Sequence, residues 1–132
     1  MIDRDLGNFR ARKDMIVSKQ SEQTQRLAAH YVDQLSDWGQ ITTRPLFGAI
    51  ALYRNKRVFA MTWHGGLYFK VDDDSRGDYE TAGSHPLGYT AEGEEQALKS
   101  YWEVPADVIE SQDKLHAWAE RAYQVALKSG KR

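Results

Sequence analysis

The chain has 132 residues, a formal net charge of −1, 41% apolar residues and 28% charged residues, which are proportions typical of one soluble globular domain. The near-zero net charge excludes a strong overall attraction to nucleic acid or to an anionic membrane, and the absence of cysteine excludes disulfides and thiol chemistry. Because the N-terminus lacks the apolar core of a signal peptide and no apolar run is long enough to cross a bilayer, we expect a cytoplasmic protein without a membrane segment.

Residues 1–20 combine mixed charge with scattered apolar groups, and we interpret them as an N-terminal extension to a single domain at 21–132. A helix is predicted from residues 20 to 38, because apolar side chains recur there at spacings of three and four and so form one stripe. Gly39 is well placed to end this helix.

Four short strands are predicted next, at residues 41–44, 50–54, 58–63 and 67–71. Pro45 interrupts the first of them and has no N–H to donate, so it favours a sheet edge or a bulge at that point. Asn55-Lys56 is predicted to form a tight hairpin turn, because asparagine tolerates the left-handed conformation. The segment His64-Gly65-Gly66 is predicted to form the next turn.

The strand at 67–71 has two distinct faces, with Leu67 and Phe69 on one and Tyr68 and Lys70 on the other. Helices must cover one of these faces, which leaves the other partly exposed. An exposed aromatic sheet face is typical of a surface that binds a second copy or another protein.

The remaining predicted elements are a short helix from Asp74 to Gly83, strands at 88–90 and 97–104, a helical turn at Pro105 and a final helix at 112–128. Ser75 and Asp78 have the spacing of a capping box at the start of the short helix. The two late strands flank a polar loop with the sequence A-E-G-E-E. The order α-β(3–4)-α-β(2)-α predicts an α+β fold, with an antiparallel sheet of about five strands and helices packed on it.

The sequence holds no motif that assigns catalysis, a metal or a cofactor, and its histidines stand alone at His30, His64, His85 and His116. The run from Asp72 begins like a calcium loop, but Arg76 occupies its fifth position and Gly83 its twelfth, where glutamate is required. We therefore predict a protein that is not an enzyme and that has no cofactor. The alternative is a small enzyme built around His64 or His85, which a histidine–carboxylate pair in a pocket would support.

Direct nucleic-acid binding is not expected, although Arg54, Lys56 and Arg57 form a basic cluster at a predicted hairpin tip. Residues 72–95 carry eight acids and one base and would repel phosphates. We interpret this acidic segment as solvated loops and helix faces, with a contact to a basic partner as the alternative.

Four segments follow one another along the chain, namely R-P-L-F-G-A-I-A-L-Y (44–53), V-F-A (58–60), L-Y-F-K-V-D-D (67–73) and Y-W-E-V-P (101–105). Together they resemble the N-terminal domain of the TfoX/Sxy family, which is associated with natural competence and transcriptional regulation in bacteria. The resemblance covers about residues 22–128. Leu46 stands where methionine is usual, and Ala49 and Ala51 replace glycines. The resemblance implies a fold similar to that of secretion chaperones, here without the C-terminal domain of the longer competence regulators.

From this resemblance we predict eight signature or partner-binding residues, namely Arg44, Phe47, Gly48, Tyr53, Tyr68, Lys70, Tyr101 and Trp102. Phe47 would plug the sheet, Gly48 would give the backbone room to turn, and Arg44 would pair with an acid or cap a helix. The leading hypothesis is a regulatory domain that acts by protein–protein contact, with a transcription regulator as one candidate partner. The alternative is a chaperone-like homodimer that holds a segment of another protein on its open sheet face.

Overall fold

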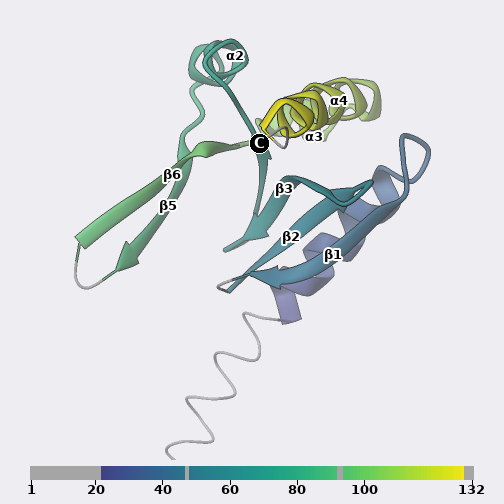
Figure 1. Cartoon of the computed structure of the whole chain (residues 1–132), viewed down its shortest axis with the longest axis horizontal. Coiled ribbons are helices and arrows are strands. Elements are labelled where there is room, and N and C mark those ends of the chain that lie inside the picture. The colour runs from purple at the N-terminus through teal and green to yellow at the C-terminus, as the bar shows by residue number, and fades with distance from the viewer. Residues whose placement is uncertain (1–21, 47, 92–93, 130–132) are drawn as a thin grey trace, which may run out of the picture.

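The computed structural model describes residues 22–46, 48–91 and 94–129, so the predicted extension at 1–20 and Phe47 lie outside the described part of the chain. An antiparallel six-stranded sheet in the order β1-β2-β3-β4-β6-β5 forms the centre of the molecule, and helices pack on it (Figure 1). The predicted α+β class is confirmed, and the sheet has six strands where about five were expected.

The strands are β1 (Ile41–Leu46), β2 (Ala49–Arg54), β3 (Arg57–Trp63), β4 (Gly66–Lys70), β5 (Pro86–Ala91) and β6 (Glu94–Glu103). The helices are an N-terminal helix described over residues 22–34, then α2 (Arg76–Thr81), α3 (Ala106–Ile109) and α4 (Gln112–Ser129). Among the described residues, no helix combines the length and the apolar character needed to cross a membrane.

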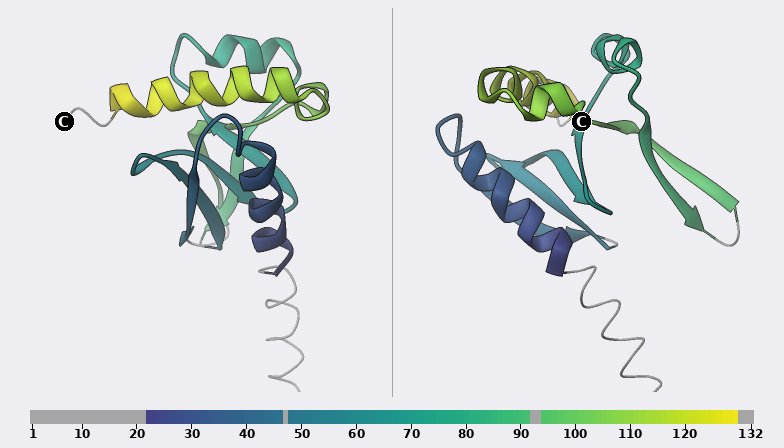
Figure 2. Two further views of the ribbon diagram at one scale, coloured as in Figure 1. Left: turned by 90° about the vertical axis from the view of Figure 1, so that its right-hand side faces the viewer. Right: turned by 180° about the vertical axis from the view of Figure 1, so that it is seen from behind.

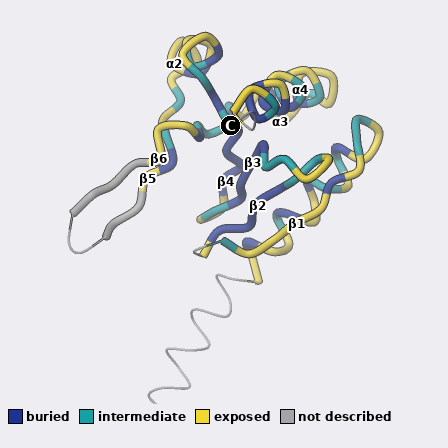
Figure 3. The backbone as a smooth tube through the Cα atoms, in the orientation of Figure 1, coloured by how far each residue is buried: buried dark blue, intermediate teal, exposed yellow. Residues whose placement is uncertain are grey.

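One face of the sheet carries the main hydrophobic core, to which the N-terminal helix and α4 contribute (Figure 2). Leu52, Phe59 and Phe69 come from three neighbouring strands and are fully buried there, as the sequence predicts. Thr62 of β3 ties the N-terminal helix to the sheet, because its Oγ1 donates a hydrogen bond to the Thr24 carbonyl oxygen over 3.1 Å. Figure 3 shows the buried residues following β2, β3 and β4 and the inner side of α4.

The two predicted tight turns are confirmed. Asn55 and Lys56 have φ angles of 49° and 67° between β2 and β3, and His64 and Gly65 have φ angles of 46° and 80° between β3 and β4. Two consecutive left-handed residues match the right-handed twist of the flanking strands, so each turn fixes the register of its hairpin.

The prediction that the first strand stops at Pro45 is wrong, since β1 continues through Pro45 to Leu46. The register pairs Pro45 with Ile50 of β2. Because β1 is an edge strand, one of its sides needs no ladder, and an edge is where a sheet tolerates a residue without an N–H.

The N-terminal helix ends earlier than predicted, since its helical residues stop at 34 and a turn follows in which the Gly39 N–H donates to the Leu35 carbonyl over 2.9 Å. Trp38 was expected in the helical stripe. Its ring instead packs edge-on against Phe59 of β3, with the ring centroids 5.2 Å apart. Tertiary packing of this side chain outweighs the helical periodicity.

Arg54, at the end of β2, packs between the turn that follows the N-terminal helix and α4. Its guanidinium carbon lies 4.3 Å from the ring centroid of Trp38 and 4.8 Å from that of Tyr123, and its Nη1 lies 3.5 Å from Glu120 Oε1. A Cβ on Gly39 would lie 2.5 Å from Arg54 Nε, so the glycine leaves room for this side chain. We call these five residues the Arg54 clamp.

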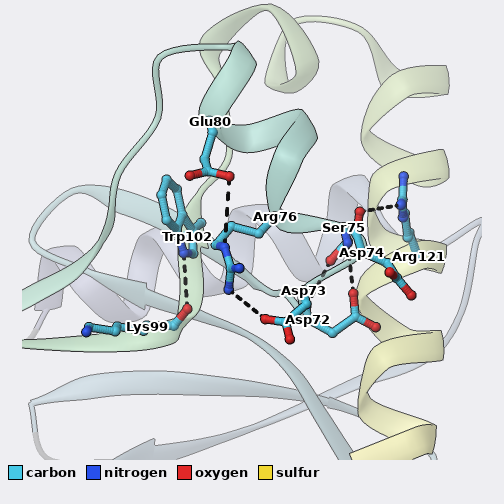
Figure 4. Close-up of polar contacts among 9 residues, drawn as sticks. All are labelled: Asp72, Asp73, Asp74, Ser75, Arg76, Glu80, Lys99, Trp102 and Arg121. Atoms are coloured by element: carbon cyan, nitrogen blue, oxygen red, sulfur yellow. Dashed lines mark hydrogen bonds and ion pairs between the residues drawn. The ribbon is translucent and has the colours of Figure 1, made fainter.

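The helix α2 is capped differently from the prediction, because Ser75 makes no capping bond toward Asp78. Ser75 instead exchanges two hydrogen bonds with Asp72, whose N–H donates to Ser75 Oγ over 3.0 Å while its Oδ1 accepts from the Ser75 N–H over 2.8 Å (Figure 4). This is the reciprocal pattern of a capping box, formed by Asp72 and Ser75 and so three residues earlier than the predicted pair Ser75 and Asp78. Gly83, with a φ of 78°, follows the helix as expected.

The β5–β6 ribbon is longer than predicted, since the expected A-E-G-E-E loop is largely strand. β4 pairs with β6 only over Tyr101–Glu103, and the register then pairs residues 87–91 of β5 with residues 94–98 of β6. We call these two paired stretches the arm. Figures 1 and 2 show the arm diverging from β1, β2 and β3.

Candidate interaction surface

The side of the sheet opposite the main core gathers residues from widely separated parts of the chain, and we call it the open face. Arg44 of β1 pairs with Ala51 of β2, Ala51 pairs with Met61 of β3, and Met61 pairs with Tyr68 of β4. Because directly opposite residues in antiparallel strands project to the same face, these side chains form one row across the sheet. Lys70 belongs to the same face two residues along β4.

A second, smaller apolar cluster forms the floor of the open face. Its buried members are Met61, Tyr68, Leu87 and Tyr101, and Leu46 and Trp63 pack against them. The expected exposure of the aromatic face is therefore wrong at Tyr68, which is 5% exposed, and Tyr101 beside it is 6% exposed. The accessible part of the face is its rim, where Arg44 is exposed and Tyr53 and Lys70 are half-buried.

The charged side chains of the open face include two bases, Arg44 and Lys70, and one acid, Glu103 of β6, which is directly opposite Tyr68 in the register. Arg44 was predicted to pair with an acid or to cap a helix. It does neither among the described residues, and its guanidinium carbon lies 5.8 Å from the Tyr53 ring centroid. Lys70 Nζ lies at the same distance from the Tyr101 ring. Both distances are at the outer limit of a cation–π contact.

Burial shifts the pKa values of the side chains in and beside this floor. It lowers the pKa of Lys70 and raises the pKa of Tyr101 to about 12, with a smaller contribution from the nearby Tyr53 hydroxyl. Burial also raises the pKa of Tyr68, and the Glu103 carboxylate adds to that increase. The Tyr68 and Tyr101 hydroxyls therefore stay protonated at neutral pH and can each donate a hydrogen bond.

Three predicted site residues do not join this surface. Trp102 pairs with Phe69 on the face of the main core, and its Nε1 donates to the Lys99 carbonyl over 3.1 Å. Gly48 lies between β1 and β2 with a φ of 85°, a conformation that glycine adopts without steric cost, as predicted for a turn. Phe47 lies outside the described residues.

Sequence reasoning missed four contributors to the floor and its edge, namely Leu46, Met61, Trp63 and Leu87. Met61 and Trp63 share the alternation phase of Phe59, so strict alternation would have placed them in the main core. The register shift between β2 and β3 puts both Phe59 and Ala60 in the core and so moves Met61 and Trp63 to the open face, which the sequence did not signal. Leu87 carried no signal either, because its segment was predicted as a connection before a three-residue strand. It joins the cluster from the start of β5.

A separate cavity of about 210 Å³ lies among β4, α2 and α4, with a lining that includes Lys70, Asp78, Tyr79, Trp118 and Arg121. Arg121 satisfies its own polar groups there, since its Nη1 lies 2.6 Å from Asp78 Oδ2. Its Nη2 donates to the Asp74 carbonyl over 3.2 Å, as Figure 4 shows. The cavity is smaller than the usual ligand pocket of about 300–1,000 Å³. It is better explained as a packing gap between α2 and α4.

One histidine has a carboxylate partner, since His85 Nε2 lies 3.3 Å from Glu103 Oε1. Their side chains are 60% and 40% exposed, and neither lines the cavity described above. Within the described ranges, no group of three or more histidines, aspartates and glutamates is placed to hold a metal ion. The pair is therefore a solvated contact at the base of the arm.

The sequence model of the TfoX N-terminal domain matches residues 33–126, which is more than half of the chain. The match starts inside the N-terminal helix, ends near the end of α4 and so includes all six strands. No curated protein matches the chain. The family match shows that this chain belongs to the TfoX N-terminal domain family.

Proposed function

We propose that this member of the TfoX N-terminal domain family is a non-catalytic regulatory domain that acts by protein–protein contact through its open face. Family membership supports a role similar to that of competence regulators, in which a protein partner such as a transcription regulator is bound and not chemically changed.

The observation that carries this proposal is the convergence on one face of five of the predicted signature residues, which come from four strands, namely Arg44, Tyr53, Tyr68, Lys70 and Tyr101. Arginine and tyrosine are enriched in protein interfaces, because a planar ring or guanidinium gives a large contact area for few rotatable bonds. The buried floor makes the surface rigid and the half-buried rim leaves polar groups accessible. A rigid surface loses little conformational entropy when it binds.

Two features of the described residues speak against the alternatives. The His85–Glu103 pair is exposed, whereas a catalytic pair gains strength from a site that excludes water. Arg54, which was predicted to belong to a basic cluster at the hairpin tip, is held in the clamp with Trp38 and Tyr123. Lys56 and Arg57 together could contact only a few phosphates, which is fewer than the six to ten contacts that give a protein strong, salt-dependent binding to DNA.

The substitution Arg44→Glu tests this proposal. Arg44 is exposed on an edge strand, so reversing its charge is expected to leave the fold intact. We expect the tagged variant to capture its protein partner from an extract of the native cell about tenfold less than the wild type does. The matched control is Arg26→Glu, which reverses a base on the N-terminal helix whose side chain is 80% exposed.

Thermal unfolding of the three proteins checks that they are equally folded. If the Arg44→Glu and Arg26→Glu variants capture the same proteins in the same amounts as the wild type, the open face is not the contact surface and the proposal is wrong.

A further inference from the structure

One row of side chains crosses the open face and carries opposite charges at its two ends. Each member of the row is directly opposite the next in the register, so all of them project to the same side of the sheet. In strand order the row consists of Arg44 of β1, Ala51 of β2, Met61 of β3, Tyr68 of β4 and Glu103 of β6. It begins with a base at the sheet edge and ends with an acid, with uncharged side chains between them.

Glu103 contacts its own chain through one carboxylate oxygen. Its Oε1 lies 3.3 Å from His85 Nε2, and its side chain is 40% exposed. A Cβ on Gly66 would lie 2.8 Å from Glu103 Oε2, so the glycine leaves room for this carboxylate beside β4. The acid at the end of the row is therefore accessible to a donor on another molecule.

The two charged ends of the row do not meet within one chain. Neighbouring strands are about 4.8 Å apart, so the four strand spacings from β1 to β6 separate the ends by about 19 Å. Arg44 is exposed, and it has no carboxylate within 4.0 Å among the described residues. Arg44 and Glu103 can therefore form an ion pair with each other only between two molecules.

A two-fold axis that runs parallel to the strands in front of Met61 brings the opposite charges together. Sheets that pack face to face lie about 10 Å apart with their strands nearly aligned. A rotation of 180° about this axis places β1 of one copy opposite β6 of the other and β2 opposite β4, and it places β3 opposite its own copy. Arg44 then faces Glu103 of the second copy.

The same rotation matches a second pair of residues at the rim. Tyr53 follows Ala51 by two residues in β2, and Lys70 follows Tyr68 by two residues in β4. Both strands are antiparallel to β3 and so run in the same direction, which puts Tyr53 and Lys70 at the same level along the sheet. Each half-buried Lys70 therefore faces a half-buried Tyr53 of the second copy, at a position suited to a cation–π contact.

The axis also brings aromatic surface together at the centre. Trp63 follows Met61 by two residues in β3, packs against the floor of the open face and is half-buried. Because β3 faces its own copy, the two Trp63 side chains meet beside the axis. Aromatic side chains at the centre of an interface contribute much of its binding energy, whereas complementary charges around them fix its register.

We propose that the occupant of the open face is the open face of a second copy of this chain, in a two-fold symmetric dimer in which Arg44 pairs with Glu103 across the interface. This inference rests on the proposed function and names the partner at the same surface. A row with a base at one end and an acid at the other is complementary to itself after the rotation. The two-fold axis makes the ion pair and the Lys70–Tyr53 contact twice.

Two variants with opposite charge reversals test the dimer. Sedimentation equilibrium on the whole chain is expected to give a dimer at about 100 μM. Arg44→Glu and Glu103→Lys are each expected to weaken self-association about tenfold or more, because each places like charges opposite each other. An equal mixture of the two variants is expected to recover a dimer that holds one chain of each, since both ion pairs in this mixed dimer join opposite charges.

The control mixture combines Glu103→Lys with Arg26→Glu, which reverses a base on the N-terminal helix whose side chain is 80% exposed. The Arg26→Glu chains are expected to pair with themselves and to leave most of the Glu103→Lys chains monomeric. Thermal unfolding checks that all variants are folded. If Glu103→Lys lowers the unfolding temperature, Glu103→Gln keeps the size of the side chain and is expected to weaken the dimer less than Glu103→Lys does.

A second readout uses the absence of cysteine from the chain. Arg44→Cys and Glu103→Cys chains, mixed and treated with a thiol cross-linker about 10 Å long, are expected to give a covalent dimer, because packed sheets lie about 10 Å apart. Each variant treated alone is expected to give little covalent dimer, since its two introduced thiols lie at opposite ends of the interface.

A monomer at about 100 μM overturns this inference. A dimer also overturns it if the mixture of Arg44→Glu and Glu103→Lys recovers no affinity, or if the mixed cysteine variants do not cross-link, because a different surface then joins the copies. If the chain is monomeric and Arg44→Glu still loses a protein from the cell extract, the proposed function stands with an unrelated partner. If Arg44→Glu weakens neither self-association nor capture, both proposals are wrong.

Discussion

At the scale of single residues, the Arg54 clamp shows how a base can serve as a core residue. The side chain of Arg54 is 24% exposed and lies between two aromatic rings, so its methylene stem is packed while its guanidinium keeps a carboxylate partner. Trp38 Nε1 donates to the same Glu120 carboxylate over 3.1 Å. The clamp joins the turn after the N-terminal helix, the end of β2 and α4, which no backbone ladder connects.

We predict that Arg54→Met lowers the free energy of unfolding by about 1–3 kcal/mol, because it removes two cation–π contacts and leaves Glu120 without its cationic partner. Gly39→Ala is expected to destabilise as well, since its Cβ would push Arg54 off the Trp38 ring. In the Arg54→Met background the same glycine substitution is expected to cost less, because the clash is gone. Urea unfolding of the four proteins gives the coupling free energy.

The control for the clamp is Arg26→Met, which removes an exposed base whose partner is Glu22 one helical turn away. Its effect is expected to stay within about 0.5 kcal/mol. Strictly additive effects of Arg54→Met and Gly39→Ala would mean that the glycine acts through the backbone and not through the clamp.

At the scale of elements, the start of α2 depends on Asp72 and Ser75. The hydrogen bond from the Ser75 N–H lowers the pKa of Asp72. A carboxyl group whose pKa is lower in the folded state stabilises the fold above its unfolded pKa, and this stabilisation is lost as the pH falls through the folded pKa. The capping contact is therefore strongest near neutral pH.

We predict that Asp72→Ala lowers the free energy of unfolding by about 0.5–2 kcal/mol at neutral pH, as is usual for the loss of a helix cap. Asp72→Asn keeps the accepting oxygen and is expected to lose less. The difference in unfolding temperature between wild type and Asp72→Asn should be constant from neutral pH downward and shrink below about pH 4. A difference that grows as the pH falls would contradict this account.

The elements that sequence reasoning predicts correctly are those fixed by local chemistry. The hairpin turns at Asn55-Lys56 and His64-Gly65 need positive φ, and the residues themselves supply it. The helix end at Trp38 and the acidic arm were predicted wrongly, because distant contacts decide them. Trp38 leaves the helical path to pack on Phe59, and a run of glutamates is typical of a loop unless a strand such as β5 pairs with it.

The same distinction applies to the candidate surface. The alternation of side chains along β4 is enough to place Tyr68 and Lys70 on the side opposite Phe69. The burial of Tyr68 could not be predicted in this way, because it depends on Leu87, which reaches the cluster from the base of the arm.

At the scale of the whole molecule, stability is concentrated on one side of the sheet. The main core joins β2, β3 and β4 to the N-terminal helix and α4, whereas the open-face cluster is small and, among the side chains that the structure describes, receives Leu87 from β5. Folding of the body is therefore expected to depend on the main core and to be nearly independent of the arm.

We predict that Phe69→Ala lowers the free energy of unfolding by about 3–5 kcal/mol, because it opens a cavity among fully buried side chains. Leu98→Ala is expected to cost less than about 1 kcal/mol when measured at high dilution, since Leu98 is 38% exposed. Urea unfolding at two protein concentrations separates folding from self-association. An equal loss for both variants at high dilution would place the arm inside the folding core.

Pro45 sits in the outermost strand on the side of the sheet away from the arm. Proline has no backbone N–H, so β1 lacks one of the donors that another chain would need to add a strand at this edge. The proline therefore opposes edge-to-edge aggregation through β1. The edge strand β1 is therefore a poor template for the strand pairing that seeds fibres.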